Sequence, residues 1–123
     1  AINSNLQKGK ILFSLKTPVI AHNIANDPCL TYANATALQL WDKYWDEMIG
    51  MPSRLTAPKE ELKHRQNTLS QITKENPIKN YQGTRINSKG EHFMIDNARI
   101  WILLDEKGQT CGQAATFNNW WRL

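Results

Sequence analysis

The chain has 123 residues, of which 41% are hydrophobic and 21% are charged. This length suits one domain with one core, and this composition excludes a chain that is disordered throughout. The formal net charge is +4, but basic residues are interleaved with acids from Lys8 to Arg122. That scatter predicts a solvated surface and no nucleic-acid partner. With no apolar run long enough to cross a bilayer and no secretory leader, we expect a cytoplasmic protein without a membrane partner.

The N-terminal third should contain one helix and two short strands. Apolar residues recur at helical spacing over residues 3–15, so residues 1–17 are expected to form an N-terminal helical cap. Residues 18–123 are expected to form the main domain. Within it, residues 19–21 and 29–33 are expected to pair as antiparallel strands around the turn signal Asn26–Asp27–Pro28.

Three helices are expected next. Asn34 is a strong N-cap residue and should end the second strand and begin a helix over residues 36–44. A short helix over residues 45–49 should stop at Gly50 and Pro52. Pro58 and the acids that follow it predict the start of a longer helix that runs to about residue 74.

The C-terminal half changes to the alternating period of strands. Strands are expected over residues 81–87, 92–104 and 109–117, joined by turns at Ser88–Lys89–Gly90 and at residues 105–108. The order is therefore a helix, two strands, three helices and a three-stranded meander. It predicts an α+β fold of the PAS-like type, a five-stranded antiparallel sheet with helices inserted between strands 2 and 3.

Several motifs carry a family resemblance. Residues 30–38 read Leu-Thr-Tyr-Ala-Asn-Ala-Thr-Ala-Leu, which resembles the PAS signature of a strand leading into an Ala/Leu helix. Residues 52–57, Pro-Ser-Arg-Leu-Thr-Ala, are similar to a segment of bacterial MEKHLA-domain proteins, as are residues 81–86 and 111–115. The residues that resemble the C-terminal MEKHLA region of plant class III homeodomain–leucine zipper proteins are Ser88, Gly90, His92, Ala98, Trp101 and 117–120.

The resemblance spans about residues 18–120 and is to a stand-alone MEKHLA protein of the bacterial type. It implies a PAS-like fold and a sensing or regulatory role, with no generally established ligand or reaction. The Met-Glu-Lys-His-Leu-Ala string that names the family is absent here, and no homeodomain or zipper is present. The role of the plant transcription factors therefore does not carry over.

A pocket between sheet and helices is the expected ligand site. Gln113 shares a strand face with Cys111 and Phe117, and an inward-facing amide must bond to a ligand or to a neighbouring side chain. The resemblance to flavin-sensing PAS domains implies a ligand-reading Gln at this strand position. Trp101 and Arg85 complete the candidate set, which we expect to bind a small apolar or aromatic molecule. The competing interpretations are that the Gln113 amide is hydrogen-bonded within the core and that Trp101 is packed there, with no ligand.

No cofactor or metal is predicted. The stretch at residues 51–55, where photoactive flavin-binding PAS domains place their cysteine, has none, although noncovalent flavin stays open. His64 is the candidate for a haem ligand, but it falls on the helix side opposite Leu62 and Leu69 and is expected in solvent. In the PAS sheet that the resemblance implies, the first strand separates the strands of Cys29 and Cys111, so a disulfide is not expected.

Enzymatic activity is not expected, and no catalytic residue is assigned. The alternative is a small cone-shaped α+β enzyme of the isomerase or dehydratase kind, which would need a pair such as His92 and Asp96 in its pocket.

Self-association is expected instead. Residues 100–104 are apolar on both strand faces, so one face needs cover from the N-terminal helix or a second subunit. A homodimer is our favoured assembly, and a purely structural dimerisation module with a filled core is a third interpretation.

Overall fold

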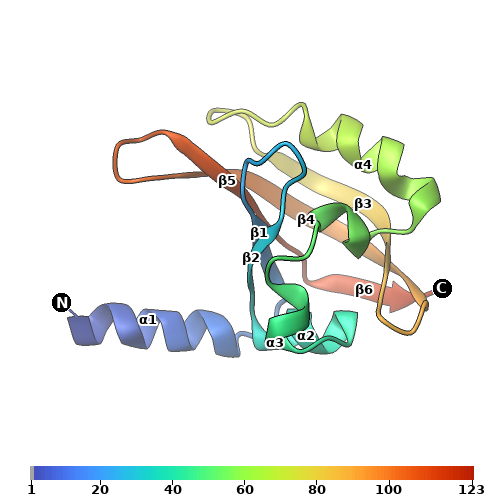
Figure 1. Ribbon diagram of the computed structural model, residues 1–123, viewed down its shortest axis with the longest axis horizontal. Helices are drawn as coiled ribbons and strands as arrows, with labels where there is room; N and C mark the ends of the chain where they lie inside the picture. The colour runs from blue at the N-terminus through green and yellow to red at the C-terminus, as the bar shows by residue number, and fades with distance from the viewer. Residues whose placement is uncertain (1) are drawn as a thin grey trace.

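The computed structural model describes residues 2–123, and their side chains from residue 7 onward (Figure 1). The strands join in one antiparallel sheet: β1 (Val19–His22), β2 (Leu30–Ala33), β3 (Ile78–Ile86), β4 (His92–Leu104), β5 (Thr110–Thr116) and β6 (Asn119–Arg122). The helical segments are α1 (Ile2–Ser14), α2 (Ala35–Trp41), α3 (Trp45–Met48), α4 (Leu62–Leu69) and the 3-10 turns η1 (Ser53–Thr56) and η2 (Lys59–Glu61).

The sheet has the spatial order β2-β1-β5-β4-β3, so the first and last thirds of the chain meet at its centre. β1 pairs with β5 through Ile20 opposite Ala115 and His22 opposite Gln113. This order confirms that β1 separates the two cysteines, which are both free.

The sixth strand was not predicted. β5 pairs with the second half of β4, and β6 pairs with its first half, with Ile95 opposite Trp120. β6 therefore continues the path of β5 after a short break, and this extended pairing explains why β4 is 13 residues long.

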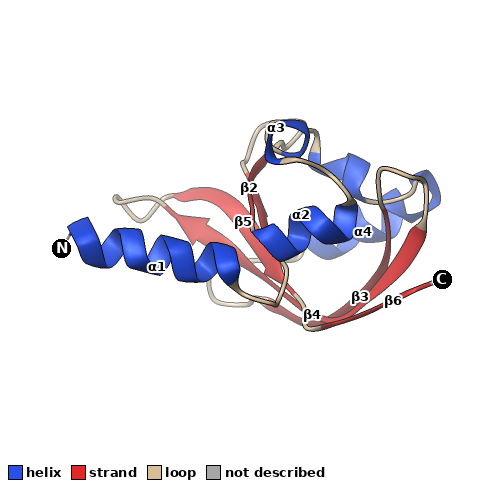
Figure 2. Cartoon of the chain, turned by 90° about the horizontal axis from the view of Figure 1, so that it is seen from below, coloured by secondary structure: helices blue, strands red, loops and turns tan. Residues whose placement is uncertain are grey.

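The inserted helical segments cover one face of the sheet (Figure 2). They are shorter than the sequence pattern suggested, because the helix expected over residues 58–74 divides into η2 and α4 and ends at Leu69. α1 extends away from this layered body (Figure 1), and its side chains from Gln7 to Ser14 are all exposed.

Trp41 is the centre of the core. Its side chain is fully buried, and its ring packs edge-on against Phe93 and Phe117, with centroids 5.2 and 6.1 Å away. Its indole N–H donates to the carbonyl of Thr56 at 3.1 Å. Such a bond is needed because a buried indole donor without a partner costs stability.

Asn34 joins three elements, and its predicted role as N-cap is confirmed. Its Oδ1 accepts hydrogen bonds from the backbone N–H groups of Ala37 (3.1 Å) and Val19 (3.0 Å). Its Nδ2 donates to the carbonyls of Thr17 (2.8 Å) and Leu12 (3.2 Å). One fully buried amide thus begins α2 and ties it to β1 and to the end of α1.

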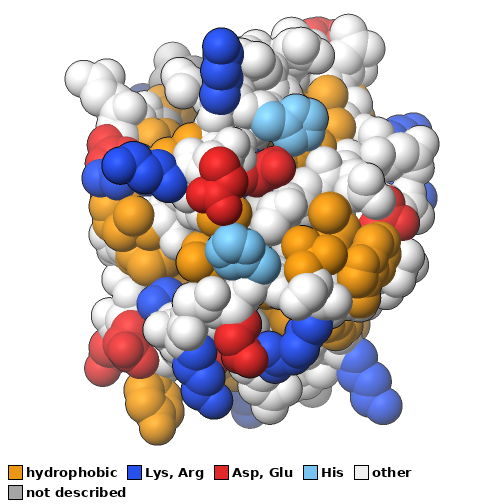
Figure 3. Space-filling model, turned by 90° about the vertical axis from the view of Figure 1, so that its right-hand side faces the viewer, with side chains coloured by type: hydrophobic (Ala, Val, Ile, Leu, Met, Phe, Trp, Pro, Cys, Tyr) orange, Lys and Arg blue, Asp and Glu red, His pale blue; other side chains and the backbone are white. Residues whose placement is uncertain are grey.

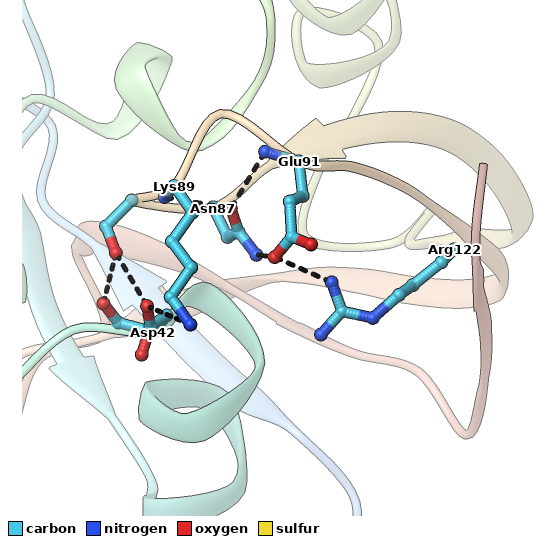
Figure 4. Close-up of polar contacts among 6 residues, drawn as sticks. Asp42, Asn87, Lys89, Glu91 and Arg122 are labelled. Atoms are coloured by element: carbon cyan, nitrogen blue, oxygen red, sulfur yellow. Dashed lines mark hydrogen bonds and ion pairs between the residues drawn. The ribbon is translucent and has the colours of Figure 1, made fainter.

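The β3–β4 turn is held by a polar network (Figure 4). Asn87 accepts from the backbone N–H groups of Lys89 and Glu91, and its amide donates to Glu91 at 2.9 Å. Hydrogen bonds to Glu91, from Asn87 first and Arg122 second, lower the pKa of its carboxyl group. We call this network the hairpin clip; its members are Asp42, Asn87, Ser88, Lys89, Glu91 and Arg122.

Surface charge is mixed on the face shown in Figure 3, where Lys and Arg side chains lie among Asp and Glu. Within residues 2–123, no helix combines the length and the apolar character needed to cross a membrane.

Candidate ligand-binding cavity

A small cavity of about 30 Å³ lies between the inner face of the sheet and the helical layer. A space of this size holds about two water molecules. Sheet and helical segments both contribute side chains: Ile20, His22, Arg85, Ile100, Gln113 and Ala115 from the strands, and Ser53, Thr56, Arg65 and Leu69 from η1 and α4.

A larger cleft of about 390 Å³ adjoins this cavity. The two spaces share four lining residues, His22, Arg65, Leu69 and Gln113. The cleft continues outward along the β1–β2 loop and α4, where Pro28 and Leu62 give it apolar walls. A molecule could therefore occupy the cleft and place one end in the cavity.

Arg85 is buried, at 5% exposure. One of its Nη atoms donates to the carbonyl of Thr84 at 2.8 Å, and the other donates to Tyr81 Oη at 3.3 Å. The guanidinium also lies 5.4 Å from the centre of the Tyr81 ring, within the range of a cation–π contact. Gly83 makes room for this arrangement, because a Cβ there would contact Tyr81 Oη and lie 3.0 Å from Arg85 Nη1.

Arg65 enters the cavity from α4, where its guanidinium donates to Ser53 Oγ. Burial and then the charge of Arg85 lower the pKa of Arg65 to about 10. The side chain is therefore still a cation at neutral pH, and two guanidinium groups of like charge share the cavity.

Gln113 and His22 form the opposite wall, side by side on β5 and β1. The Gln113 amide donates to the carbonyl of Leu69 at 3.4 Å. Its buried Oε1 lies close to the His22 side chain, but no described residue meets the distance and angle of a full hydrogen bond to it. His22 Nδ1 donates to the carbonyl of Asn23 at 2.8 Å. Burial lowers the pKa of His22; the hydrogen bond to Asn23 opposes this, the charge of Arg65 adds to it, and the nearby Gln113 side chain again opposes it.

Of the five predicted pocket residues, Gln113 and Arg85 line the cavity and three do not. Ile100 pairs with Ala115 and both line the cavity, whereas Trp101 is the next residue along β4 and so points to the opposite face. Trp101 therefore lies on the outer face of the sheet. Because residues 100–104 are apolar on both faces, alternation alone could not assign the inward one.

Cys111 and Phe117 share the strand face of Gln113 in the simple pattern but lie outside the cavity. Cys111 is exposed near the tip of the β4–β5 hairpin, which projects beyond the helical layer (Figure 1). Phe117 follows the end of β5 and is buried against Trp41 and Trp120.

The haem candidate, His64, lies on the exposed side of α4 as the helical spacing predicted. Its ring stacks on Tyr81, with centroids 5.7 Å apart, and it does not line the cavity. It is therefore not placed to ligate a group held between sheet and helices.

Arg65 is the cavity residue that the sequence analysis missed. A signal was present, because Arg65 lies three residues after Leu62 and four before Leu69 and so shares their face of the helix. An arginine on the apolar face of an amphipathic helix indicates either a buried partner or a ligand.

Comparison with known proteins gives both family and fold. A family model for the MEKHLA domain matches residues 2–122. A PAS domain of a protein from Colwellia psychrerythraea superposes with a TM-score of 0.80 at 12% identity, covering 94% of this chain and 96% of that one. A PAS domain of an HTR-like protein from Haloarcula marismortui gives 0.73 at 13% identity, covering 94% of this chain and 92% of that one.

A LOV protein from Rhodobacter sphaeroides gives a TM-score of 0.72 at 10% identity, covering 98% of this chain and 68% of that one. A search of curated protein sequences finds no significant match. At these identities the structural likeness establishes the α+β PAS fold, which confirms the predicted architecture.

Proposed function

Because this chain belongs to the MEKHLA domain family and folds as a PAS domain, we propose that it is a sensory or regulatory module that binds a small molecule between its sheet and its helices. The observation that carries this proposal is the cavity, which buried polar side chains line and which adjoins a larger cleft. Buried polar groups without partners are costly, so a protein retains them where a ligand uses them.

Binding is tested by screening small molecules against the ¹⁵N-labelled protein by NMR. Ligands of the cavity should shift the backbone signals of β1, β5 and α4. Ala115→Val adds volume inside the cavity and should abolish those shifts, whereas Ala25→Val, in the exposed β1–β2 loop, should leave them unchanged. Equal shifts in both variants would place binding elsewhere and contradict the proposal.

We also propose that the module forms a homodimer in which a second copy covers α1. The observation in favour is that Ile11, Leu12 and Phe13 are 63%, 39% and 38% exposed on a helix that extends away from its own domain (Figure 1). Adjacent exposed apolar side chains of this kind are typical of interaction surfaces.

Light scattering after gel filtration tests the dimer. The wild type should have twice the mass of the chain, and Ile11→Glu should reduce it to a monomer. Ile24→Glu is the matched control, because Ile24 is 60% exposed but lies in the β1–β2 loop. A wild-type monomer at about 100 µM, or an equal effect of the two variants, would contradict the proposed interface.

We propose no catalytic activity, and a cytoplasmic location. The enzyme alternative required His92 and Asp96 together in a pocket, but neither lines the cavity. They are four residues apart on β4, which separates their Cα atoms by about 13 Å. The Asp96 carboxylate instead accepts hydrogen bonds from the amides of Gln82 and Asn119.

A further inference from the structure

Neither cavity arginine forms an ion pair with a carboxylate of the described residues. Ion pairs within 4.0 Å join Arg54 to Asp27, Lys89 to Asp42 and Arg122 to Glu91, and no described carboxylate lies that close to Arg65 or Arg85. The Arg54–Asp27 pair is at the mouth of the outer cleft, where Asp27 is already neutralised.

Both guanidinium groups also keep unused donors. A guanidinium carries several N–H groups in a planar fork. The hydrogen bonds of Arg85 within the chain go to Thr84 and Tyr81, and Arg65 bonds to Ser53. Two partly desolvated cations of like charge, both lining one cavity and both with N–H groups unused by the described residues, form a site that lacks an anion.

We propose that this cavity binds the carboxylate group of a small organic acid between Arg65 and Arg85. The inference rests on the proposed small-molecule function and specifies its ligand. A carboxylate matches the fork of a guanidinium through paired N–H···O hydrogen bonds. Its negative charge also reduces the electrostatic repulsion between the two arginines, which destabilises the unliganded protein.

The dimensions favour a carboxylate over a phosphate. The cavity of about 30 Å³ is small, and a planar carboxylate needs less of it than a tetrahedral phosphate does. A carboxylate presents two oxygens, whereas a phosphate monoester presents three. The remainder of the acid lies in the outer cleft of about 390 Å³, against Leu62, Leu69 and Pro28.

Gln113 adds a second requirement. Its Oε1 is a buried acceptor for which no described residue meets the distance and angle of a full hydrogen bond, and Gln113 lines the same cavity beside His22. A carboxylate cannot donate to it, but a hydroxyl next to the carboxylate can. We therefore expect an acid with a hydrogen-bond donor next to its carboxylate to bind more tightly than the simple acid.

The test uses minimal probes titrated into the ¹⁵N-labelled full chain. Acetate should shift the backbone signals of Arg65, Arg85 and Gln113 saturably, with a Kd in the millimolar range expected for so small a ligand. Acetamide, which has the same shape without the charge, should not saturate at these residues. Glycolate, which adds the hydroxyl, should bind at least about threefold more tightly than acetate.

Variants link binding to the arginines. Arg65→Met and Arg85→Met should each weaken acetate binding at least about tenfold, which corresponds to loss of one charge-assisted contact. Arg99→Met is the matched control, because Arg99 is exposed and does not line the cavity, and it should not change the Kd. Retained dispersion of the spectra shows that each variant is folded.

The outcomes separate this inference from the proposed function. If acetate and acetamide bind equally well at the cavity, small-molecule binding stands and the carboxylate assignment is wrong. If inorganic phosphate binds there and acetate does not, the assignment to carboxylates is likewise wrong. If neither anion shifts the cavity signals but a neutral compound such as indole does, the proposed function survives alone. If no probe shifts them, both proposals fail.

Discussion

Removal of the Arg65 charge should stabilise the unliganded protein. At neutral pH Arg65 is charged in both the folded and the unfolded chain, so the cost of burying the cation beside Arg85 is fully present at every pH below about 10. A pKa lowered to about 10 from the usual value of a guanidinium corresponds to about 3 kcal/mol, at about 1.4 kcal/mol per pKa unit. Arg65→Met keeps a long apolar stem and removes this cost.

The net increase in the free energy of unfolding is smaller, because the variant also loses the hydrogen bond to Ser53 Oγ. A hydrogen bond of a charged group contributes about 1.5 kcal/mol, so we expect Arg65→Met to gain about 1–2 kcal/mol. For a chain of this size that raises the Tm by roughly 4–8 °C.

Urea unfolding at pH 7, with tryptophan fluorescence as the signal, measures this change. Arg54→Met is the control: its ion pair with Asp27 is about half exposed, so its loss should change stability by less than about 0.5 kcal/mol. A loss of more than about 1 kcal/mol in Arg65→Met would show that the chain itself satisfies this guanidinium, and the reasoning about the cavity would be refuted.

Three other substitutions test the fold. Asn34→Asp keeps the acceptor that caps α2 but loses both hydrogen bonds that the amide donates to buried carbonyls. Urea unfolding should show that the free energy of unfolding falls by about 3 kcal/mol, and a fall of less than about 1 kcal/mol would contradict the role of Asn34 in joining the three elements. Gly112→Ala places a Cβ against the carbonyl oxygen of His22, so the free energy of unfolding should fall by about 2 kcal/mol in the same measurement. Gly9→Ala is the control, because a Cβ at Gly9 meets open space and should not lower the free energy of unfolding. The lowered pKa of Glu91 means that its carboxylate stabilises the fold above its usual pKa, and that this contribution disappears as the pH falls through the lowered value. The difference in unfolding free energy between wild type and Glu91→Gln should therefore shrink on acidification, and a difference independent of pH would contradict the role of the hairpin clip.

The elements that the sequence predicted well carry local signals at both ends. β4 was predicted with the bounds that the structure shows, because alternation runs through it and a glycine-containing turn lies at each end. Asn34 was assigned as N-cap for a similar reason, since an Asn between a strand and an apolar helical pattern has few other roles.

The elements that it missed depend on distant partners. β6 contains Trp120 and Trp121, and its four residues carry no local signal for their pairing with Ile95 and Met94, which makes the segment a strand. α4 ends at Leu69, and the turn that follows it buries Ile72 in the core, a packing contact that helical spacing does not report.

The site shows the same division. Gln113 was found because a polar residue on an apolar strand face is a local anomaly. Arg65 and Arg85 are 20 positions apart and belong to a helix and a strand, so only the tertiary fold brings them to one cavity. The spacing of residues along the sequence therefore could not show that these two arginines share a cavity without a carboxylate to pair with.

The side-chain NMR signals of the arginines test the central claim most directly. Each Nε–H reports its own hydrogen bond, and a carboxylate acceptor moves that proton downfield. On addition of acetate, we predict saturable downfield shifts at Arg65 and Arg85, with the same midpoint, and no such shift with acetamide. Shifts confined to the exposed arginines Arg54, Arg99 and Arg122, or an equal response to acetamide, would contradict a carboxylate site in this cavity.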